Sequence, residues 1–395
     1  MSRSGIRNNG NECFMNSSFQ ILASSPFIQE FMTRYKSDDT RIFAIINKFN
    51  LGKFKAVEIK EECTKIIREH SNSLDAKEKS ILEHIINHSA DIFIYIAFKD
   101  IINKLSEKKI QVINNSLFHS IGKELTTEIN YEHLFNGDQH DPHEFICYLL
   151  DRLHKSKQSK VKISLPPNID ELDIYSKLYH THFKARYEND YSYFVKNFYY
   201  YMLNCVECFK CKNKTYEVCP NESLCVSIPT IEELKEVKGN TDQITLDDCL
   251  NDMFKVEIID YKCEKCGNNA ENRIEKKILS KPKTLIIKIK RYIQQNTFMG
   301  IRLVKNNKMV YYPEIININQ HICGQKDCNY ELYGIINHYG GLNGGHYYSF
   351  VKEIDPISGK HKENWISCND SQVSNISDQD AMTSQNAYIL FYNLI

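Results

Sequence analysis

The chain has 395 residues, of which 42% are hydrophobic and 25% charged, so it has enough apolar material for a large core in two or three domains. Its 50 basic and 50 acidic side chains give a formal net charge of zero. This balance argues against a nucleic-acid or membrane-surface partner, and no apolar run is long enough to span a bilayer.

The N-terminal segment combines a polar start with a cysteine at the head of a predicted helix. MSRSGIRNNG contains no apolar stretch, so we expect no secretory signal. In GNECFMNS, Cys13 precedes Phe14, Ser18 and Leu22, which recur at helical spacing. The N–H groups at the start of a helix favour a thiolate and lower the thiol pKa. Cys13 is therefore a candidate nucleophile, with a buried thiol or a metal ligand as the alternatives.

Helical periodicity continues through the first 155 residues. The clearest case is DPHEFICYLLDRLH, in which Asp141 is placed to cap the helix and Pro142 suits its first turn. The following stretch, 156–194, is less patterned and is interrupted by SLPPN. We interpret it as a linker or an insertion.

The cysteine spacing predicts a metal site. Fourteen cysteines without a secretory signal argue against a disulfide framework. Two C-x-x-C knuckles can supply four sulfurs to one structural Zn²⁺. The second knuckle is Cys263 and Cys266, and the first is either Cys205 and Cys208 or Cys208 and Cys211. We favour the latter pair, and the alternative is a set of thiols that binds no metal.

From about residue 195 the pattern becomes strand-like, in LCVSIP, TLIIKIKRY, YELYGIINHYG, GHYYSFVKEI and AYILFYNL. In TLIIKIKRY, Leu285, Ile287 and Ile289 share one face of the strand, whereas Lys288 and Lys290 share the other. Helices followed by an antiparallel β region indicate an α+β fold.

A possible base and a residue to orient it lie in this β region. His338 and His346 flank a glycine-rich loop in NHYGGLNGGHYYSF, where glycines would let a substrate backbone pass close by. Asn369 and Asp370 are neighbours in ENWISCNDSQV, and strand alternation allows only one of them to face an imidazole easily. Together with Cys13 they form a Cys/His/Asn set, a known hydrolase arrangement, although a histidine is more often purely structural.

These motifs together resemble the ubiquitin-specific protease family, the papain-like cysteine deubiquitinases. GIRNNGNECFMNSSFQIL is similar to the family's cysteine box, QHDPHEFICYLLDRLH to its central motif, and the two C-x-x-C pairs to its zinc-ribbon fingers. YELYGIINHYGGLNGGHYYSFVK and NWISCNDSQVSNIS are similar to its palm strands and histidine box. The motifs follow the family order from residue 5 to residue 392.

The resemblance implies one catalytic domain, 1–395, shaped like a hand. It implies a helical thumb at 1–155, the insertion or linker at 156–194, fingers with the zinc ribbon at 195–280 and a palm at 281–395. Ubiquitin would lie against the fingers, and its Gly-Gly tail would enter a narrow cleft between thumb and palm.

The resemblance also implies roles for individual residues. Cys13 is the expected nucleophile, His346 the base, Asn369 the third member and Asp370 an assisting neighbour, while Asn8 would help to hold the oxyanion. The residues expected to grip the ubiquitin tail are Gln139, Asp141, Gly345 and Tyr347. The expected structural Zn²⁺ ligands are Cys208, Cys211, Cys263 and Cys266.

The function implied is thiol-dependent hydrolysis of the bond after the C-terminal glycine of ubiquitin. Glu12 departs from the small hydroxyl residue usual in the family, and a carboxylate facing Cys13 would oppose thiolate formation. A ubiquitin-binding pseudoenzyme and a protease for a ubiquitin-like modifier therefore remain alternatives. We expect a monomer in the cytoplasm, the nucleus or both, with ubiquitin and ubiquitinated proteins as its partners.

Overall fold

The chain divides into two compact units, each assembled from segments that are distant in sequence. The computed structural model describes residues 3–53, 56–107, 111–125, 131–239, 242–267, 269–297, 300–324, 327–341, 344–355 and 357–395. The first unit consists of Met1–Gln158 and His346–Ile376, and the second of Ser159–Gly345 and Ser377–Ile395.

The first unit is mainly helical, as the periodicity predicts. Its helices are α1 (Cys13–Ala23), α2 (Pro26–Arg34), α3 (Lys36–Lys48), α4 (Ala56–Glu69), α5 (Ala76–Glu107), α6 (Ser116–Leu125) and α7 (Pro142–Ser156). Its strands are β1 (Gly5–Ile6), β2 (Val112–Ile113), most of β15 (Gly344–Ile354), β16 (His361–Asn369) and β17 (Gln372–Ile376). Across the described residues, no helix is both long and apolar enough to span a membrane.

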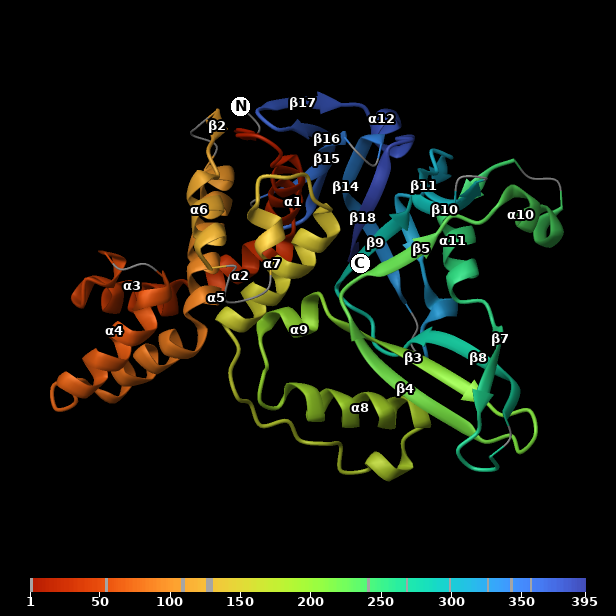
Figure 1. Ribbon diagram of the computed structural model, residues 1–395, viewed down its shortest axis with the longest axis horizontal. Helices are drawn as coiled ribbons and strands as arrows, with labels where there is room; N and C mark the ends of the chain where they lie inside the picture. Colours follow the sequence, from red (N-terminus) through yellow and green to blue (C-terminus); the bar gives the residue numbers. More distant parts are fainter. Residues whose placement is uncertain are drawn as a thin grey trace. The chain divides into compact units, whose positions relative to one another are not determined.

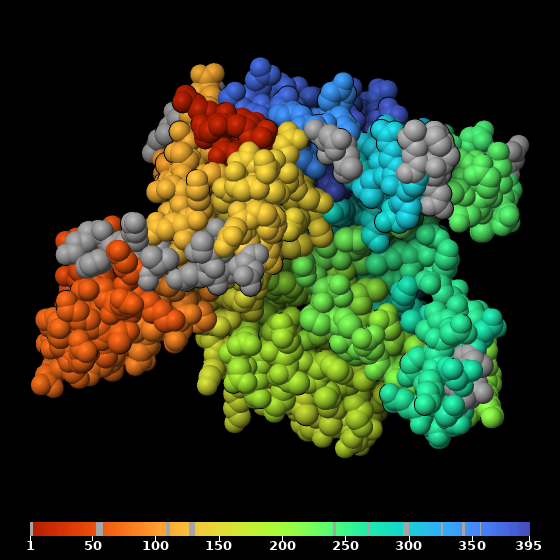
Figure 2. Space-filling view, viewed as in Figure 1, coloured from red at the N-terminus to blue at the C-terminus, as the bar shows by residue number. Residues whose placement is uncertain are grey.

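Helices α3 and α4 and the first part of α5 form a lobe of the first unit with its own apolar core. The buried side chains of this core are Ile42, Ile45, Leu51, Ile59, Cys63, Ile66, Leu74, Leu82, Ile85 and Ile92. Figure 1 shows these helices running together, and Figure 2 shows their surface in orange. Helix α5 departs from helical geometry at His88 (φ −135°, ψ 29°), where the lobe joins the rest of the unit.

A buried carboxylate in this lobe connects α3 with two other helical segments. Asp39 in α3 is 3% exposed and accepts hydrogen bonds from Tyr95 Oη (2.5 Å) and Lys157 Nζ (2.7 Å), and also pairs with Lys99. These donors come from α5 and from the end of α7. Three helical segments are therefore joined at one charged group.

The N-terminal strand is fixed against the turn between β16 and β17. Asp370 and Ser371 form a two-residue turn between Asn369 and Gln372, and Asp370 has a φ of 50°, which aspartate tolerates better than most side chains. The N–H of Ile6 donates to the Asp370 carbonyl at 2.8 Å. A Cβ on Gly5 would lie only 2.4 Å from the Ser371 carbonyl oxygen, so glycine is required there. Figure 1 places the N-terminus beside β17.

The second unit contains two groups of paired strands. In the first group, β3 (Tyr200–Glu207), β4 (Lys214–Asn221), β7 (Glu257–Lys262) and β8 (Asn269–Ile278) run antiparallel in the order β4-β3-β8-β7. The second has the order β14-β18-β9-β5, formed by β14 (Asn329–Gly341), β18 (Ala387–Leu394), β9 (Thr284–Lys290) and β5 (Leu224–Ser227). The pairing of β5 with β9 is parallel, unlike the others in these two groups.

Short elements complete the second unit. Its helices are α8 (Ile174–Tyr187), α9 (Tyr193–Asn197), α10 (Ile231–Lys238), α11 (Leu246–Met253) and α12 (Asp378–Met382). Its remaining strands are β6 (Ile244–Thr245), β10 (Tyr292–Thr297), β11 (Gly300–Lys305), β12 (Val310–Tyr311) and β13 (Ile315–Asn317).

The segment interpreted as a linker contains a packed helix. Helix α8 begins after Asp173, whose side chain accepts the N–H groups of Tyr175 (2.9 Å) and Ser176 (3.1 Å). Aromatic side chains of α8 pack into an apolar cluster with residues of strand β3. The sequence pattern is weak because the apolar face of α8 is built from tyrosine and phenylalanine interspersed with histidine and lysine.

Candidate active site and metal centre

Cys13 is the first residue of α1 and is only 1% exposed. Burial raises the pKa of the Cys13 thiol above its ordinary value of 9.0, although the backbone N–H groups of Tyr347, Phe14 and Cys13 favour the thiolate. The negative charge of Asp370 adds to the increase. The N–H groups at the start of the helix do lower this pKa, as expected, but desolvation of the thiolate outweighs them and the net shift is upward.

His346 is oriented by the side chain of Asn369. Its Nε2–H donates to Asn369 Oδ1 at 2.6 Å, which leaves Nδ1 as the basic ring nitrogen. The next residue, Tyr347, is the one whose backbone N–H reaches the Cys13 thiol. All of these residues belong to the first unit, and the Tyr347 N–H brings the chain next to His346 up to the Cys13 thiol.

The Asp370 carboxylate accepts hydrogen bonds from side-chain amides and not from the imidazole of His346. Its Oδ2 lies 3.9 Å from His346 Nε2, beyond hydrogen-bond range. The same Oδ2 accepts from Asn8 Nδ2 at 2.9 Å, and Oδ1 accepts from Asn16 Nδ2 at 2.8 Å. Of the two neighbours that the sequence left open, Asn369 is thus the partner of the ring.

Asn8 is held at both ends of its amide. Its Oδ1 accepts the backbone N–H groups of Gly10 (3.0 Å) and Glu12 (3.2 Å), while one hydrogen of Nδ2 goes to Asp370. An amide nitrogen carries two hydrogens, so Asn8 can donate a second one. This geometry suits a donor to a developing oxyanion.

The Glu12 carboxylate is directed at the loop that precedes it. Its Oε2 accepts the backbone N–H (3.2 Å) and the Nδ2 (3.1 Å) of Asn9, and its Oε1 lies 4.0 Å from His119 Nε2. Glu12 is 8% exposed, so these contacts satisfy a buried charge. The residue that departs from the family pattern is therefore engaged with Asn9.

The two residues expected from the central motif lie next to the Cys13 loop. Asp141 caps α7 by accepting the N–H of His143 at 2.9 Å, as predicted, and Gln139 is exposed two residues before it. Asn11 Nδ2 donates to the Gly137 carbonyl at 3.0 Å. This bond ties the segment that carries Gln139 to the loop that carries the cysteine.

Gly345 is required by the packing of its own unit. A Cβ there would lie 2.2 Å from His338 Nε2 and 2.7 Å from the Tyr339 carbonyl oxygen. The position that this Cβ would take is occupied by the buried ring of His338, while Gly345 itself is only half-buried. His338 Nδ1 lies 3.4 Å from Tyr292 Oη, which is typical of a structural histidine. The fourth tail-binding candidate, Tyr347, is buried.

Four cysteines in the second unit can hold a metal ion. The sulfurs of Cys208, Cys211, Cys263 and Cys266 all lie within 4.8 Å of one another. The distance from Cys208 Sγ to Cys266 Sγ is 3.8 Å, and that from Cys211 to Cys263 is 3.7 Å. Zn–S bonds of about 2.3 Å in a tetrahedron place the sulfurs about 3.8 Å apart, so the set fits Zn²⁺.

The two knuckles have the same backbone geometry. Lys212 and Gly267, each directly after the second cysteine, have φ values of 59° and 67°. Each donates its N–H to the carbonyl of the first cysteine, to Cys208 at 2.9 Å and to Cys263 at 2.8 Å. Cys205 pairs with Tyr216 in the β3–β4 ladder, outside the group of four. The geometry therefore favours Cys208 and Cys211 as the first knuckle.

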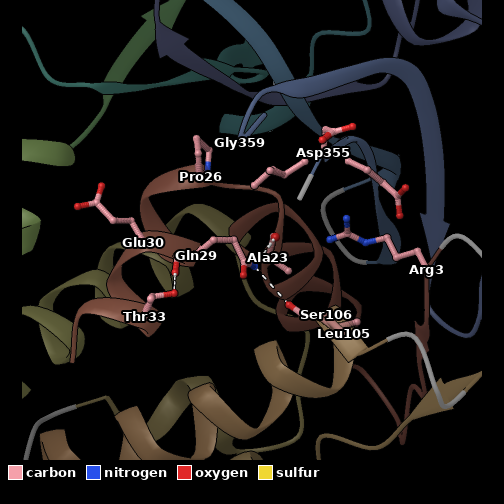
Figure 3. A pocket seen from close by; sticks show the side chains of 12 residues that line it. Arg3, Ala23, Pro26, Gln29, Glu30, Thr33, Leu105, Ser106, Asp355 and Gly359 are labelled. Atoms are coloured by element: carbon pink, nitrogen blue, oxygen red, sulfur yellow. Dashed lines mark hydrogen bonds between the residues drawn. The ribbon is translucent and has the colours of Figure 1, made fainter. Parts of the chain in front are cut away.

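A cavity of about 680 Å³ lies elsewhere in the first unit and contains none of the predicted site residues. It is lined mainly by apolar atoms, including those of Ala23, Pro26, Leu105 and Ile354 (Figure 3). Arg3 also lines it, but its guanidinium is bonded to Gln20 and Ser24. The Arg3 guanidinium thus holds the N-terminal segment against α1 through these hydrogen bonds.

The sequence of this chain is similar to those of known proteins. A family model described as ubiquitin carboxyl-terminal hydrolase matches residues 4–392. The chain is 25% identical to the probable ubiquitin carboxyl-terminal hydrolase R319 of Acanthamoeba polyphaga mimivirus, over 98% of this chain and 89% of that protein. It is 30% identical to ubiquitin carboxyl-terminal hydrolase 2 of Gallus gallus, over 69% of this chain and 73% of that protein. It spans only 34% of a Drosophila melanogaster relative, Usp2.

Solved structures share the fold. The SAGA DUB module of Ubp8, Sgf11, Sus1 and Sgf73 bound to monoubiquitin matches with a TM-score of 0.64 at 20% identity, over all of this chain and 69% of that one. The same module bound to ubiquitin aldehyde matches with a TM-score of 0.61 at 21% identity. The expected α+β fold of thumb, palm and fingers is confirmed, with a zinc-ribbon-like cysteine cluster.

Proposed function

Because this chain belongs to the ubiquitin carboxyl-terminal hydrolase family, we propose that it is a thiol-dependent deubiquitinase. It hydrolyses the peptide or isopeptide bond after the C-terminal glycine of ubiquitin. The observation that carries the proposal is the oriented imidazole: His346 Nε2 is bound to Asn369, one residue from the Tyr347 N–H at the Cys13 thiol.

The reaction begins from a protonated thiol, because burial raises the pKa of Cys13. As Sγ attacks the glycine carbonyl, His346 Nδ1 takes the thiol proton, and a tetrahedral oxyanion forms. The C–N bond then breaks, and His346 passes its proton to the leaving amine. Water next attacks the thioester and gives a proton to His346, which returns it to the departing Cys13 sulfur.

The oxyanion of both tetrahedral intermediates is held by the second Nδ2 hydrogen of Asn8 and by the backbone N–H of Cys13. Asp370 contributes through Asn8, whose amide it orients at 2.9 Å. We assign Gln139, Asp141, Gly345 and Tyr347 to the ubiquitin tail on the family pattern. Such contacts hold the reacting carbonyl near Sγ and reduce the entropy cost of attack.

We further propose that Cys208, Cys211, Cys263 and Cys266 bind one Zn²⁺. The fit of their sulfur separations to a tetrahedron supports this proposal. The ion would join the β3–β4 and β7–β8 turns and has no open position for catalysis. None of the fourteen cysteines forms a disulfide, which suits a reducing compartment, so we propose the cytoplasm, the nucleus or both as the location. We also propose that the protein acts as a monomer.

The central test uses ubiquitin that carries a thiol-reactive group at its C-terminus. We expect a covalent adduct with the wild-type chain and with Cys147→Ser, a half-buried cysteine of the same unit, and none with Cys13→Ala. Tight ubiquitin binding without an adduct would support a pseudoenzyme instead. Reaction only with a ubiquitin-like modifier that carries the same group would show that the substrate is that modifier and not ubiquitin.

A further inference from the structure

A chain of hydrogen bonds connects Glu12 with Asp370. Asp370 Oδ1 accepts from Asn16 Nδ2 (2.8 Å), and Asn16 Oδ1 accepts from Asn115 Nδ2 (3.0 Å). Asn115 Oδ1 accepts from Asn9 Nδ2 (3.1 Å), which also donates to Glu12 Oε2 (3.1 Å). Two carboxylates thus terminate a relay of three amides, drawn from the Cys13 loop, α1 and the segment before α6.

Much of this relay is shielded from water. Asn16 and Asn115 are each 1% exposed, and Glu12 is 8% exposed. A buried amide or carboxylate that loses its partner is expensive, so Asn16, Asn115 and Glu12 are held to these partners. Asn9 is exposed, and its Nδ2 also lies 3.3 Å from Asn114 Oδ1. The buried members of the relay can therefore transmit a position.

The residues at both ends of the relay hold Asn8, which also accepts the N–H of Gly10. Asp370 accepts from Asn8 Nδ2, and the backbone N–H of Glu12 donates to Asn8 Oδ1. Glu12 also closes the loop around Asn8, since its carboxylate binds the N–H of Asn9. If Glu12 or Asp370 moves, the second Nδ2 hydrogen of Asn8 no longer points toward the position of the oxyanion.

We propose that Glu12 and Asn115 are positioning residues that fix the Asn8 amide toward the developing oxyanion. The inference rests on the proposed function, and neither residue contacts the reacting atoms. Glu12 thus supports catalysis by positioning Asn8, although a carboxylate beside Cys13 was expected to oppose thiolate formation.

A double-mutant cycle tests the inference. Glu12→Ala and Asn115→Ala should each lower kcat for a ubiquitin C-terminal fluorophore substrate about tenfold, with KM within about twofold, because only the intermediate is affected. Glu12→Gln keeps an acceptor for Asn9 and should stay within about threefold of wild type. When Asn8→Ala is already present, Glu12→Ala should cause no further loss, since its effect passes through Asn8.

A second measurement separates positioning from general damage. Alkylation of Cys13 by iodoacetamide forms no oxyanion, so its rate should be unchanged in Glu12→Ala and Asn115→Ala. Glu30→Ala and Asn103→Ala, which change exposed side chains of the same unit, should behave as wild type in both assays.

Two results would overturn the inference while leaving the proposed function intact. One is full additivity of Glu12→Ala with Asn8→Ala in an active enzyme. The other is an alkylation rate that falls in parallel with kcat. A wild-type chain that forms no adduct with reactive ubiquitin would instead overturn the proposed function, and the inference with it.

Discussion

Asn369 Oδ1 accepts a 2.6 Å hydrogen bond from His346 Nε2, although the charged carboxylate of Asp370 is the next residue along the chain. Asn369 is the last residue of β16, and the left-handed turn at Asp370 carries that side chain to Asn8 and Asn16. A neutral amide therefore orients the ring, and the carboxylate orients the proposed oxyanion donor.

Asn369→Ala should lower kcat about 10²-fold, because an imidazole without its Nε2 partner samples other orientations and tautomers. Asn369→Asp should retain most activity, since the carboxylate still accepts from Nε2. Steady-state hydrolysis of a ubiquitin C-terminal fluorophore substrate measures both. A loss below threefold in Asn369→Ala would assign the orienting role to another residue.

Asn8→Ala should lower kcat by about 10²–10³ with little change in KM, because it removes a donor that acts on the oxyanion. The adduct with thiol-reactive ubiquitin should still form, more slowly. Arg7→Ala, which changes an exposed side chain at the start of the same loop, is the control. Equal losses in both variants would indicate damage to the loop rather than loss of one donor.

Alkylation of Cys13 in the substrate-free protein should increase with pH and have its midpoint above 9.0, since burial raises the thiol pKa. The thiol is the neutral form, and desolvation penalises the thiolate, so reactivity appears only as pH rises through the folded pKa. Mass spectrometry of the Cys13 peptide after timed iodoacetamide treatment gives the profile. A midpoint near pH 7 would show that a thiolate–imidazolium pair exists before substrate binds.

Removal of metal should destabilise the second unit. Cys211→Ser should bind less zinc and unfold at a lower temperature than wild type, because one thiolate is missing from the tetrahedron. Cys205→Ser, three residues before the first knuckle in β3, should keep both zinc content and melting temperature. Elemental analysis and thermal melts with and without chelator measure this. Equal zinc loss in both variants would favour the other pairing.

Asp39→Asn should lower the free energy of unfolding by about 3–5 kcal/mol at neutral pH, because two lysines are left without their shared carboxylate. Asp38→Asn changes an exposed neighbour and should cost less than about 0.5 kcal/mol. Although burial raises it, the pKa of Asp39 is lowered overall by Lys157, Lys99 and Tyr95. The ionised Asp39 carboxylate therefore stabilises the fold fully at pH values above 3.8, the ordinary pKa of aspartate. This stabilisation is lost as the pH falls through the pKa of Asp39 in the folded protein.

Urea denaturation at neutral pH and at several values below pH 4 checks this prediction. The difference between wild type and Asp39→Asn should narrow in acid, because Asp39 itself becomes protonated there. A difference that does not depend on pH would mean that the variant acts through packing alone.

The helices and strands that have regular local sequence patterns could be predicted. Asp141 and Pro142 specify the start of α7, and the alternation in TLIIKIKRY specifies β9. Helix α8 was missed because its apolar face is aromatic and mixed with charge. The net direction of the Cys13 pKa shift could not be predicted for a related reason: the position of Cys13 at the start of a helix is visible in the sequence, but its burial depends on what packs over it.

The amino-acid sequence alone determined the family, the α+β class and the residues with chemical capacity, because motif order and spacing are properties of the chain. Tertiary structure decided which of two neighbours serves the imidazole, which cysteines form the first knuckle and what Glu12 binds. Each of those outcomes depends on contacts between segments far apart in the chain, such as Asn16 with Asn115 and Asn8 with Asp370. No local pattern encodes such a contact, since its energy arises only when folding removes both groups from water.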